Sequence, residues 1–178
     1  MRLFVAAQLP VELVDALAET SASLRSCVSG RFVGPDLFHV TLAFLGEVPA
    51  MQVTEVASLV RISCDGMPPF STTLGALGSF GRRSQAVLWQ GFSAGQDEWA
   101  ELARRVRAGL DEGGFAYDGK GFLPHVTLMR RANVAHGTLP VPCVERGVVD
   151  TVVLYASDLS GPRPRYEPIE CVKLQQDG

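Results

Sequence analysis

Two of the three histidines in this chain occur in a repeated tetrapeptide, His-Val-Thr-Leu. The first copy begins at His39 and the second at His125, about half a chain length apart. A tetrapeptide that contains a rare residue seldom recurs by chance in a chain of 178 residues. The repeat therefore predicts two similar halves, each giving one histidine and one threonine to a shared site.

Each copy has the composition of a β-strand with one polar face. Because side chains alternate between the faces of a strand, His39 shares a face with Thr41, and His125 shares a face with Thr127. The valine and leucine of each copy point the other way and are apolar enough to form core. Two half-buried strands with outward His and Thr would explain either motif alone, but the recurrence favours a common site.

Two imidazoles in one site suit acid–base catalysis. Histidine titrates near neutral pH, so one ring can accept a proton while the other donates one. The threonine hydroxyls add hydrogen-bond donors for a phosphate oxygen, and Arg130 and Arg131 follow the second motif closely. An arginine beside the site favours an oxyanion or a phosphate. Phosphoryl transfer depends mainly on positioning and charge stabilisation, which these groups supply without a metal.

The position of Arg130 raises a question of geometry. It lies an odd number of residues from His125, so in a straight strand its side chain points away from the shared face. It reaches the site if the strand ends or bulges near Met129, or if its long side chain curls around the edge. Arg163 and Arg165, in a turn-rich stretch near the end of the chain, are the alternative cations on the phosphate side.

A zinc site is the competing interpretation of the two histidines. A catalytic zinc usually has three protein ligands, and neither motif offers an Asp, Glu or Cys on the histidine face. The third histidine, His136, falls in a loop-like stretch. A cysteine nucleophile is another alternative, but the four cysteines are widely spaced, form no CxxC motif and suit reduced thiols. The residues therefore favour a site with no metal and no other cofactor.

Composition and charge limit the class of protein. The chain is 47% hydrophobic and 20% charged, which is enough to build a core. A formal net charge of −3 argues against a protein that coats long nucleic acid, and fits a small anion or an RNA end better. The short apolar N-terminus predicts a first strand and not a signal peptide, and no apolar run approaches the roughly 20 residues of a membrane span. We therefore expect a cytoplasmic protein without a membrane segment.

Hydrophobic periodicity predicts strands interleaved with three helices. The expected strands are residues 3–8, 32–33, 38–45, 70–77, 85–92, 122–129, 148–157 and 167–174, and the expected helices are 10–27, 51–62 and 96–110. Residues 132–147 predict a loop, and the arginines of the third helix predict a solvated face. Short connections favour antiparallel pairing. The expected class is α+β, with two antiparallel sheets in two lobes, outer helices and a cleft with pseudo-twofold symmetry, within one domain of residues 1–178.

With these surroundings, the chain resembles the two-histidine (2H) phosphoesterase superfamily. Within it, the chain is most similar to the RNA 2′,3′-cyclic phosphodiesterases formerly called 2′-5′ RNA ligases, the LigT-like group. One HxT motif alone is a weak signal, whereas two in matching surroundings are specific. The resembling segments are residues 2–6 with Leu9-Pro10, residues 38–46, residues 74–80 with 87–89, and residues 122–130. The chain departs from the pattern at residues 31–35, where the family often has a tryptophan and a second basic residue; Phe32 can replace the ring, but Gly34 cannot replace a charge.

The resemblance implies a bilobal fold and hydrolysis of a 2′,3′-cyclic phosphate to a 2′-phosphomonoester without a metal. It implies that His125 is the general base, or proton acceptor, that activates water. His39 is then the general acid, or proton donor, that protonates the departing 3′ oxygen. Thr41 and Thr127 are expected to hold non-bridging oxygens, and Arg130 to bind phosphate.

Two other functions stay open at this point. The same site could act on another cyclic phosphate or on a 2′-5′ linkage, which is the 2′-5′ RNA ligase-type activity. Alternatively, the cleft could bind RNA ends without catalysis. The expected partners are RNA 2′,3′-cyclic phosphate ends or small cyclic nucleotides, with no membrane, and the protein is expected to be a monomer.

Overall fold

Strands and helices alternate along the chain in the computed structural model, which describes residues 1–134 and 138–175. The helices are α1 (Val11–Leu24), α2 (Val53–Cys64) and α3 (Gln96–Glu112), with two short 3₁₀ helices, η1 (Pro35–Leu37) and η2 (Ala50–Gln52). The strands are β1 (Arg2–Gln8), β2 (Ser29–Phe32), β3 (His39–Glu47), β4 (Phe70–Phe80), β5 (Ala86–Ala94), β6 (His125–Asn133), β7 (Arg146–Val149), β8 (Thr151–Asp158) and β9 (Arg165–Lys173).

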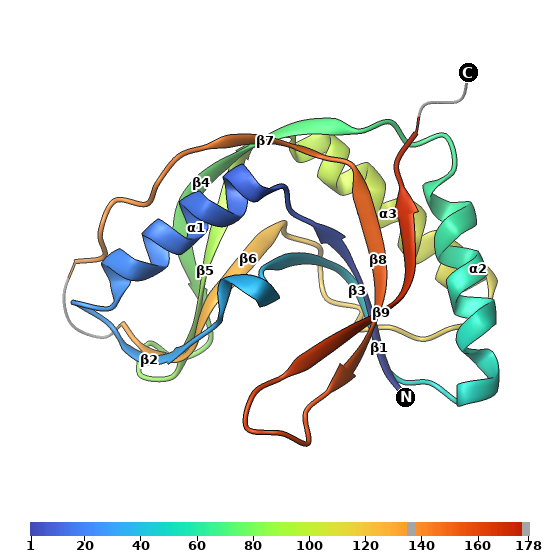
Figure 1. Cartoon of the computed structure of the whole chain (residues 1–178), viewed down its shortest axis with the longest axis horizontal. Helices are drawn as coiled ribbons and strands as arrows, with labels where there is room; N and C mark the ends of the chain where they lie inside the picture. The colour runs from blue at the N-terminus through green and yellow to red at the C-terminus, as the bar shows by residue number, and fades with distance from the viewer. Residues whose placement is uncertain (135–137, 176–178) are drawn as a thin grey trace.

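The strands form two sheets. One has four strands in the order β3-β1-β8-β9, and the other has five in the order β2-β6-β5-β4-β7. Every pairing between the described strands is antiparallel. In Figure 1 the five-stranded sheet lies behind α1, and α2 lies at the opposite edge, beyond β9. The α+β class with two antiparallel sheets and flanking helices is confirmed.

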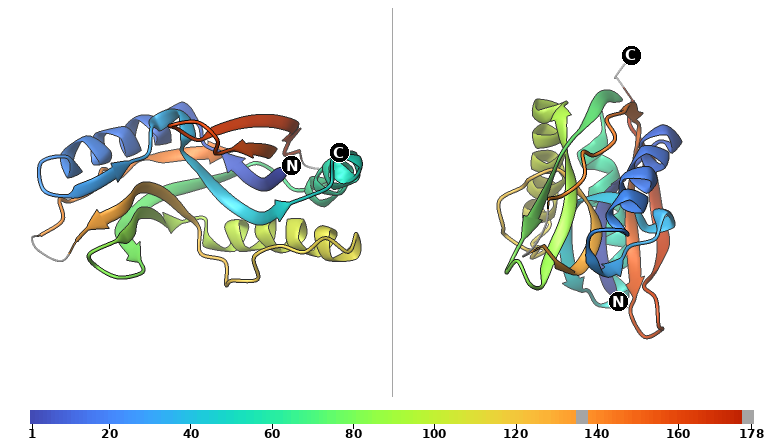
Figure 2. Two further views of the ribbon diagram at one scale, coloured as in Figure 1. Left: turned by 90° about the horizontal axis from the view of Figure 1, so that it is seen from below. Right: turned by 90° about the vertical axis from the view of Figure 1, so that its left-hand side faces the viewer.

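The helices bury the apolar stripes that their sequences predict. On α3 the buried side chains are Trp99, Leu102, Ala103, Val106 and Leu110, at helical spacing. The indole N–H of Trp99 donates to the hydroxyl of Thr72 on β4 at 2.9 Å, so the polar atom of this buried ring is satisfied. Figure 2 shows two layers, with α1 and the β8–β9 hairpin in one and β4, β5, β6 and α3 in the other. The motif strands β3 and β6 come from different layers.

Both motif strands contain a β-bulge at the same place. Thr41 pairs with Ala6 and Ala43 pairs with Val5, so Leu42 is an extra residue in β3. In β6, Thr127 pairs with Trp89 and Met129 pairs with Leu88, so Leu128 is the extra residue. A bulge leaves its extra residue out of the ladder and bends the strand.

The carbonyl group of each bulge residue finds a donor outside its own ladder. The Leu42 oxygen accepts from the guanidinium Nε of Arg107 on α3, at 3.0 Å. The Leu128 oxygen accepts from the backbone N–H of Val33, at 2.9 Å. Buried backbone carbonyls require such partners, so these donors help to fix both bulges. The prediction that the arginines of α3 form a solvated face is therefore wrong for Arg107, although Arg104 and Arg105 pair with Glu101 as surface residues.

Two predicted segments near the end of the chain need correction. Residues 148–157 were expected to form one strand, but the strand breaks at Asp150 into β7, in the five-stranded sheet, and β8, in the four-stranded sheet. The loop predicted over residues 132–147 is shorter than expected, because β6 continues to Asn133 and β7 begins at Arg146. The sequence is rich in β-branched residues on both sides of Asp150, so it does not indicate that one strand ends there and that the next belongs to the other sheet.

No helix in residues 1–134 and 138–175 is both long enough and apolar enough to cross a membrane.

Candidate active site

His39 opens β3 directly after η1. Its Nδ1–H donates to the backbone oxygen of Leu37 at 2.8 Å, and its Nε2 lies 3.0 Å from the hydroxyl of Thr41. The bond to Leu37 places the proton of the neutral ring on Nδ1, so Nε2 is the nitrogen that exchanges a proton. Strand alternation therefore puts the imidazole and the threonine hydroxyl together, as the motif predicts.

His125 is held in the same way in the other half. It opens β6, and its Nδ1–H donates to the backbone oxygen of Leu123 at 2.7 Å. In both halves the acceptor is the carbonyl two residues before the histidine, so the two rings have the same tautomer. Thr127 is half-buried on the same face of β6 as His125. Each half thus supplies one imidazole with Nε2 as its reactive nitrogen and one hydroxyl.

Aromatic side chains surround both imidazoles. The His39 ring lies 5.1 Å from Phe4 and 5.5 Å from Tyr166, measured between ring centroids. The His125 ring lies 5.1 Å from Phe80 and 5.7 Å from Trp89. These contacts fix the ring orientations and remove water from their sides. Neither Tyr166 nor Phe80 was predicted as a site residue, because each reaches the site only through the sheet pairing of its own hairpin.

The pKa of each histidine is lowered. Burial is the largest cause for His39, and the positive charges of Arg130 and His125 add to it; the bond to Leu37 acts in the opposite direction. Together these effects lower the pKa of His39 to about 4. Burial is also the main cause for His125, again with a contribution from Arg130. Both rings are therefore neutral at pH 7 in the free protein, and protonation of His125 further disfavours protonation of His39.

Arg130 reaches the site because of the bulge at Leu128. Leu128 and Met129 are both buried, so the strand alternation shifts by one residue and the exposed Arg130 falls on the face of His125 and Thr127. A straight strand would have turned it away, and the bulge resolves this difficulty. The equivalent position after the first bulge is Phe44, over which the guanidinium of Arg2 lies 4.8 Å from the ring centroid.

Two cavities that share several lining residues lie beside His39. The smaller, about 150 Å³, is lined by Arg31, His39, Thr127, Arg130, Arg163 and Tyr166, among others. The larger, about 420 Å³, includes Arg2, Phe4, Thr41 and Phe44 together with His39 and Arg130. The first cavity brings together residues of both motif strands and a residue of the β8–β9 connection. Of the two alternative cations considered from the sequence, Arg163 lines this cavity, whereas Arg165 lines a neighbouring one with Tyr155 and Pro168.

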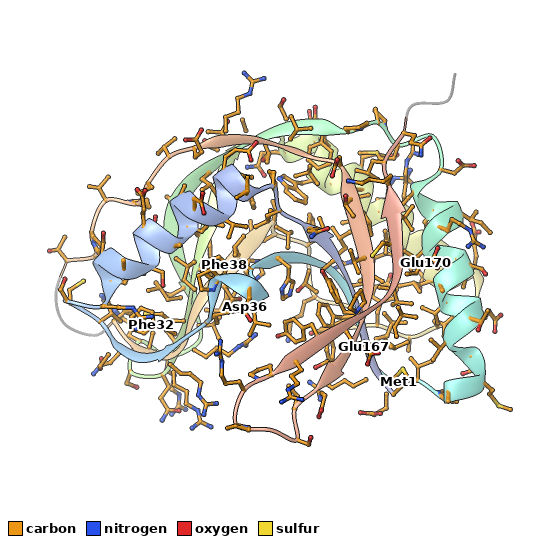
Figure 3. The ribbon with its side chains drawn as sticks, viewed as in Figure 1. Met1, Phe32, Asp36, Phe38, Glu167 and Glu170 are labelled. Atoms are coloured by element: carbon orange, nitrogen blue, oxygen red, sulfur yellow. The ribbon has the colours of Figure 1, made fainter. Side chains whose placement is uncertain are left out.

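Arg31, Phe32, Val33 and Gly34 all line the smaller cavity beside His39. Arg31 on β2 pairs directly with Arg130, so both guanidinium groups leave the sheet on the same side. Phe32 pairs with the buried Met129 and packs on the core, with the guanidinium of Arg25 4.2 Å from its ring centroid, and it also lines the smaller cavity beside His39, where the sequence placed an aromatic ring. Figure 3 labels Phe32 on β2. Arg31 therefore lines the cavity beside Arg130, a position that the strand expected over residues 32–33 did not indicate.

The alternatives of a metal and a cysteine nucleophile find no geometry in the described residues. Within residues 1–134 and 138–175, no three His, Cys, Asp or Glu side chains form a group that could hold a metal ion. His136, the third histidine of the zinc interpretation, lies outside the described residues. None of the four cysteines lines the two cavities beside His39, and burial raises the pKa of the Cys64 thiol to about 12.

Known proteins are similar to this chain in sequence and in fold. The family model described as the 2′-5′ RNA ligase superfamily matches residues 4–140. A protein of Escherichia coli named RNA 2′,3′-cyclic phosphodiesterase is 34% identical over 177 residues, which cover 98% of this chain and 97% of that protein. A protein of the same name from Thermus thermophilus is 32% identical and covers 98% of this chain and 91% of its own. The crystal structure of E. coli LigT complexed with 3′-AMP superposes with a TM-score of 0.84 at 32% identity, covering 98% of both chains.

Proposed function

Because this chain belongs to the 2′-5′ RNA ligase superfamily of two-histidine phosphoesterases, we propose that it hydrolyses 2′,3′-cyclic phosphates at RNA ends or on nucleosides to 2′-phosphomonoesters. Similar proteins of nearly the same length, from E. coli and T. thermophilus, are named RNA 2′,3′-cyclic phosphodiesterases, and the similar structure of E. coli LigT is complexed with 3′-AMP. A nucleotide-sized anion is the ligand that the basic cavity beside His39 favours.

The observation that carries the proposal is the matched presentation of two imidazoles. In each half the backbone carbonyl two residues before the histidine takes the Nδ1 proton, which leaves Nε2 to act on substrate. Arg130 is close enough to lower the pKa of both rings. A phosphate that touches Arg130 therefore lies near both reactive nitrogens, where the two threonine hydroxyls donate to its non-bridging oxygens.

The reaction is an in-line displacement at phosphorus. Water loses a proton to Nε2 of His125, and its oxygen forms the new bond to phosphorus. The bond from phosphorus to the 3′ oxygen breaks on the opposite side, and that oxygen takes a proton from Nε2 of His39. The product is a 2′-phosphomonoester with a free 3′ hydroxyl, and each histidine ends in the protonation state in which the other began.

The acid role of His39 depends on the charge of the substrate. With a pKa of about 4 in the free protein, His39 is a poor proton donor at neutral pH. The phosphate brings a negative charge beside His39, Arg130 and His125, which opposes the two effects that lower the pKa of His39, burial and the positive charge of Arg130. Substrate binding thus raises the pKa of His39 and makes it a proton donor, whereas both rings are neutral in the free protein.

The test is turnover of defined substrates by the purified protein. We expect hydrolysis of adenosine 2′,3′-cyclic phosphate to adenosine 2′-phosphate, identified by chromatography against both monophosphate isomers, and we expect it to survive EDTA. Release of the 3′ isomer would contradict the assignment of the leaving oxygen. Stoichiometric binding without turnover would support an RNA-end binder, and selective action on a 2′-5′ linkage would support the ligase-type activity.

A further inference from the structure

Arg31 and Arg130 form a pair of like charges on neighbouring strands. They are directly opposite in the β2–β6 ladder, an arrangement that destabilises a sheet. Neither guanidinium has a carboxylate within ion-pair distance in the part of the chain that the structure describes. Two unneutralised arginines side by side at the wall of a cavity indicate that an anion from outside the protein completes the site.

Arg163 adds a third positive charge from a different part of the fold. It lies in the connection between β8 and β9, which projects from the four-stranded sheet in Figure 1. A Cβ atom at position 34 would stand 2.8 Å from its Nη2 and would also collide with the Asp36 carboxylate. Gly34 therefore makes room for the guanidinium of Arg163 beside β2.

The carboxylate of Asp36 does not neutralise Arg163 effectively. The two groups are 3.5 Å apart, and their side chains are 70% and 69% exposed. An ion pair this exposed is worth little and is easily exchanged for another anion. Figure 3 labels Asp36 on η1, directly before the strand that carries His39. Arg163 is thus held at the cavity wall and remains available to a ligand.

The three arginines differ in how they relate to the two histidines. Arg130 is the arginine whose charge lowers the pKa of both histidines. Arg31 and Arg163 line a cavity that includes His39 but not His125. In the in-line reaction the leaving 3′ oxygen belongs to the terminal nucleoside and takes its proton from His39. The terminal nucleoside, and the RNA on its 5′ side, therefore lie on the same side of the phosphate as His39.

We propose that Arg31 and Arg163 form a second phosphate subsite, which binds the phosphodiester on the 5′ side of the terminal nucleotide and so favours RNA ends over free cyclic nucleotides. This inference rests on the proposed function and specifies its substrate. Arg31 donates from the five-stranded sheet and Arg163 from the β8–β9 connection, so the RNA backbone passes between the two layers. When the phosphodiester binds, it replaces the carboxylate of Asp36 as the partner of the Arg163 guanidinium.

The test compares two substrates that differ by one phosphodiester. These are adenosine 2′,3′-cyclic phosphate and the dinucleotide ApA that ends in the same cyclic phosphate. We expect wild-type protein to prefer the dinucleotide in kcat/KM. Arg163→Ala should reduce that preference about 10-fold, mainly through KM, as expected for loss of a hydrogen bond between charged groups. Arg163→Lys should restore part of it, and Arg31→Ala should act in the same direction as Arg163→Ala.

Arg104→Ala is the matched control, because it removes the same charge from the outer face of α3. It should keep the wild-type preference. An unchanged preference in Arg163→Ala, or an equal loss in Arg104→Ala, would overturn the subsite. A binding assay distinguishes failure of the subsite from failure of the proposed function, because it needs no turnover. In that assay Arg163→Ala should weaken binding of ApA 3′-phosphate more than binding of adenosine 3′-phosphate. Equal weakening of both ligands would overturn the subsite independently of any catalysis.

Discussion

Saturating the cleft with adenosine 2′-phosphate should return the pKa of His39 from about 4 to near its ordinary value of 6.5. The pKa of this ring is lowered in the free protein by burial and by the positive charge of Arg130, and His125 adds to the effect when its own ring is protonated. The difference between the two pKa values corresponds to roughly 3.4 kcal/mol. A phosphate bound between these groups adds the charge that the site lacks.

One negative charge is sufficient for a change of this size. At about 4 Å and an effective dielectric constant of about 20, a single opposite charge stabilises the imidazolium by roughly 4 kcal/mol. That interaction matches the approximate cost of protonating the ring in the free protein. The substrate phosphate alone therefore makes His39 a competent acid near neutral pH, and no further residue is required.

The assay is a pH titration of the histidine signals by NMR, without and with a saturating concentration of the nucleotide. Single His→Gln variants assign the signals of His39 and His125. A signal of His39 that still titrates near pH 4 in the complex would refute its role as the acid. A His39 signal that titrates near pH 6.5 in the free protein would refute the inferred effect of burial and neighbouring charge.

Three further predictions concern variants and pH. His39→Ala or His125→Ala should each lower kcat by about 10²–10⁴-fold, and the double variant should lose less than the product of the two, because the rings act as a pair; full activity in either folded single variant would contradict the assignment. Arg130→Ala should weaken substrate binding more than Arg130→Lys, and its loss of activity should be smaller than that of either histidine variant; wild-type kinetics would place this arginine outside the site. The free energy of unfolding should fall as pH decreases from 6.5 towards 4, by up to about 3 kcal/mol from His39, because the unfolded chain binds a proton at this histidine at higher pH than the folded protein does. Urea titrations should show that the free energy of unfolding depends less on pH in His39→Gln than in wild type, and an identical pH dependence in the two proteins would count against a buried neutral ring.

The sequence predicted the elements whose patterns are local. The apolar stripe of α3 and the alternation of His39 with Thr41 depend only on neighbours along the chain, and both are observed. The change of sheet at Asp150 depends on which strands pair with β7 and β8, and no local pattern encodes it. The same limit applies to the site.

The residues that sequence reasoning missed reach the site through pairing between distant segments. Arg31 becomes a site residue because β2 pairs with β6, and Tyr166 because the β8–β9 hairpin folds over His39. Arg130 was predicted from its place after the second motif and from the family resemblance, but composition and periodicity could not decide whether a bulge or a curled side chain brings it to the site. Arg107 was misjudged because the carbonyl that it binds belongs to another element.

The paired bulges make the length of each motif as important as its composition. Removing Leu128 would leave an apolar strand of nearly the same character, yet it would turn Arg130 towards the core and leave the phosphate without its nearest cation. The same deletion at Leu42 would turn Phe44 inward and break the bond that Arg107 makes to the strand. Point substitutions at these leucines keep the spacing, whereas a one-residue deletion changes which face every later side chain occupies. The two halves of this chain, and of related chains, are therefore best aligned with the number of residues after each motif kept equal. In that alignment Phe44 corresponds to Arg130, because each is the third residue after the threonine of its motif.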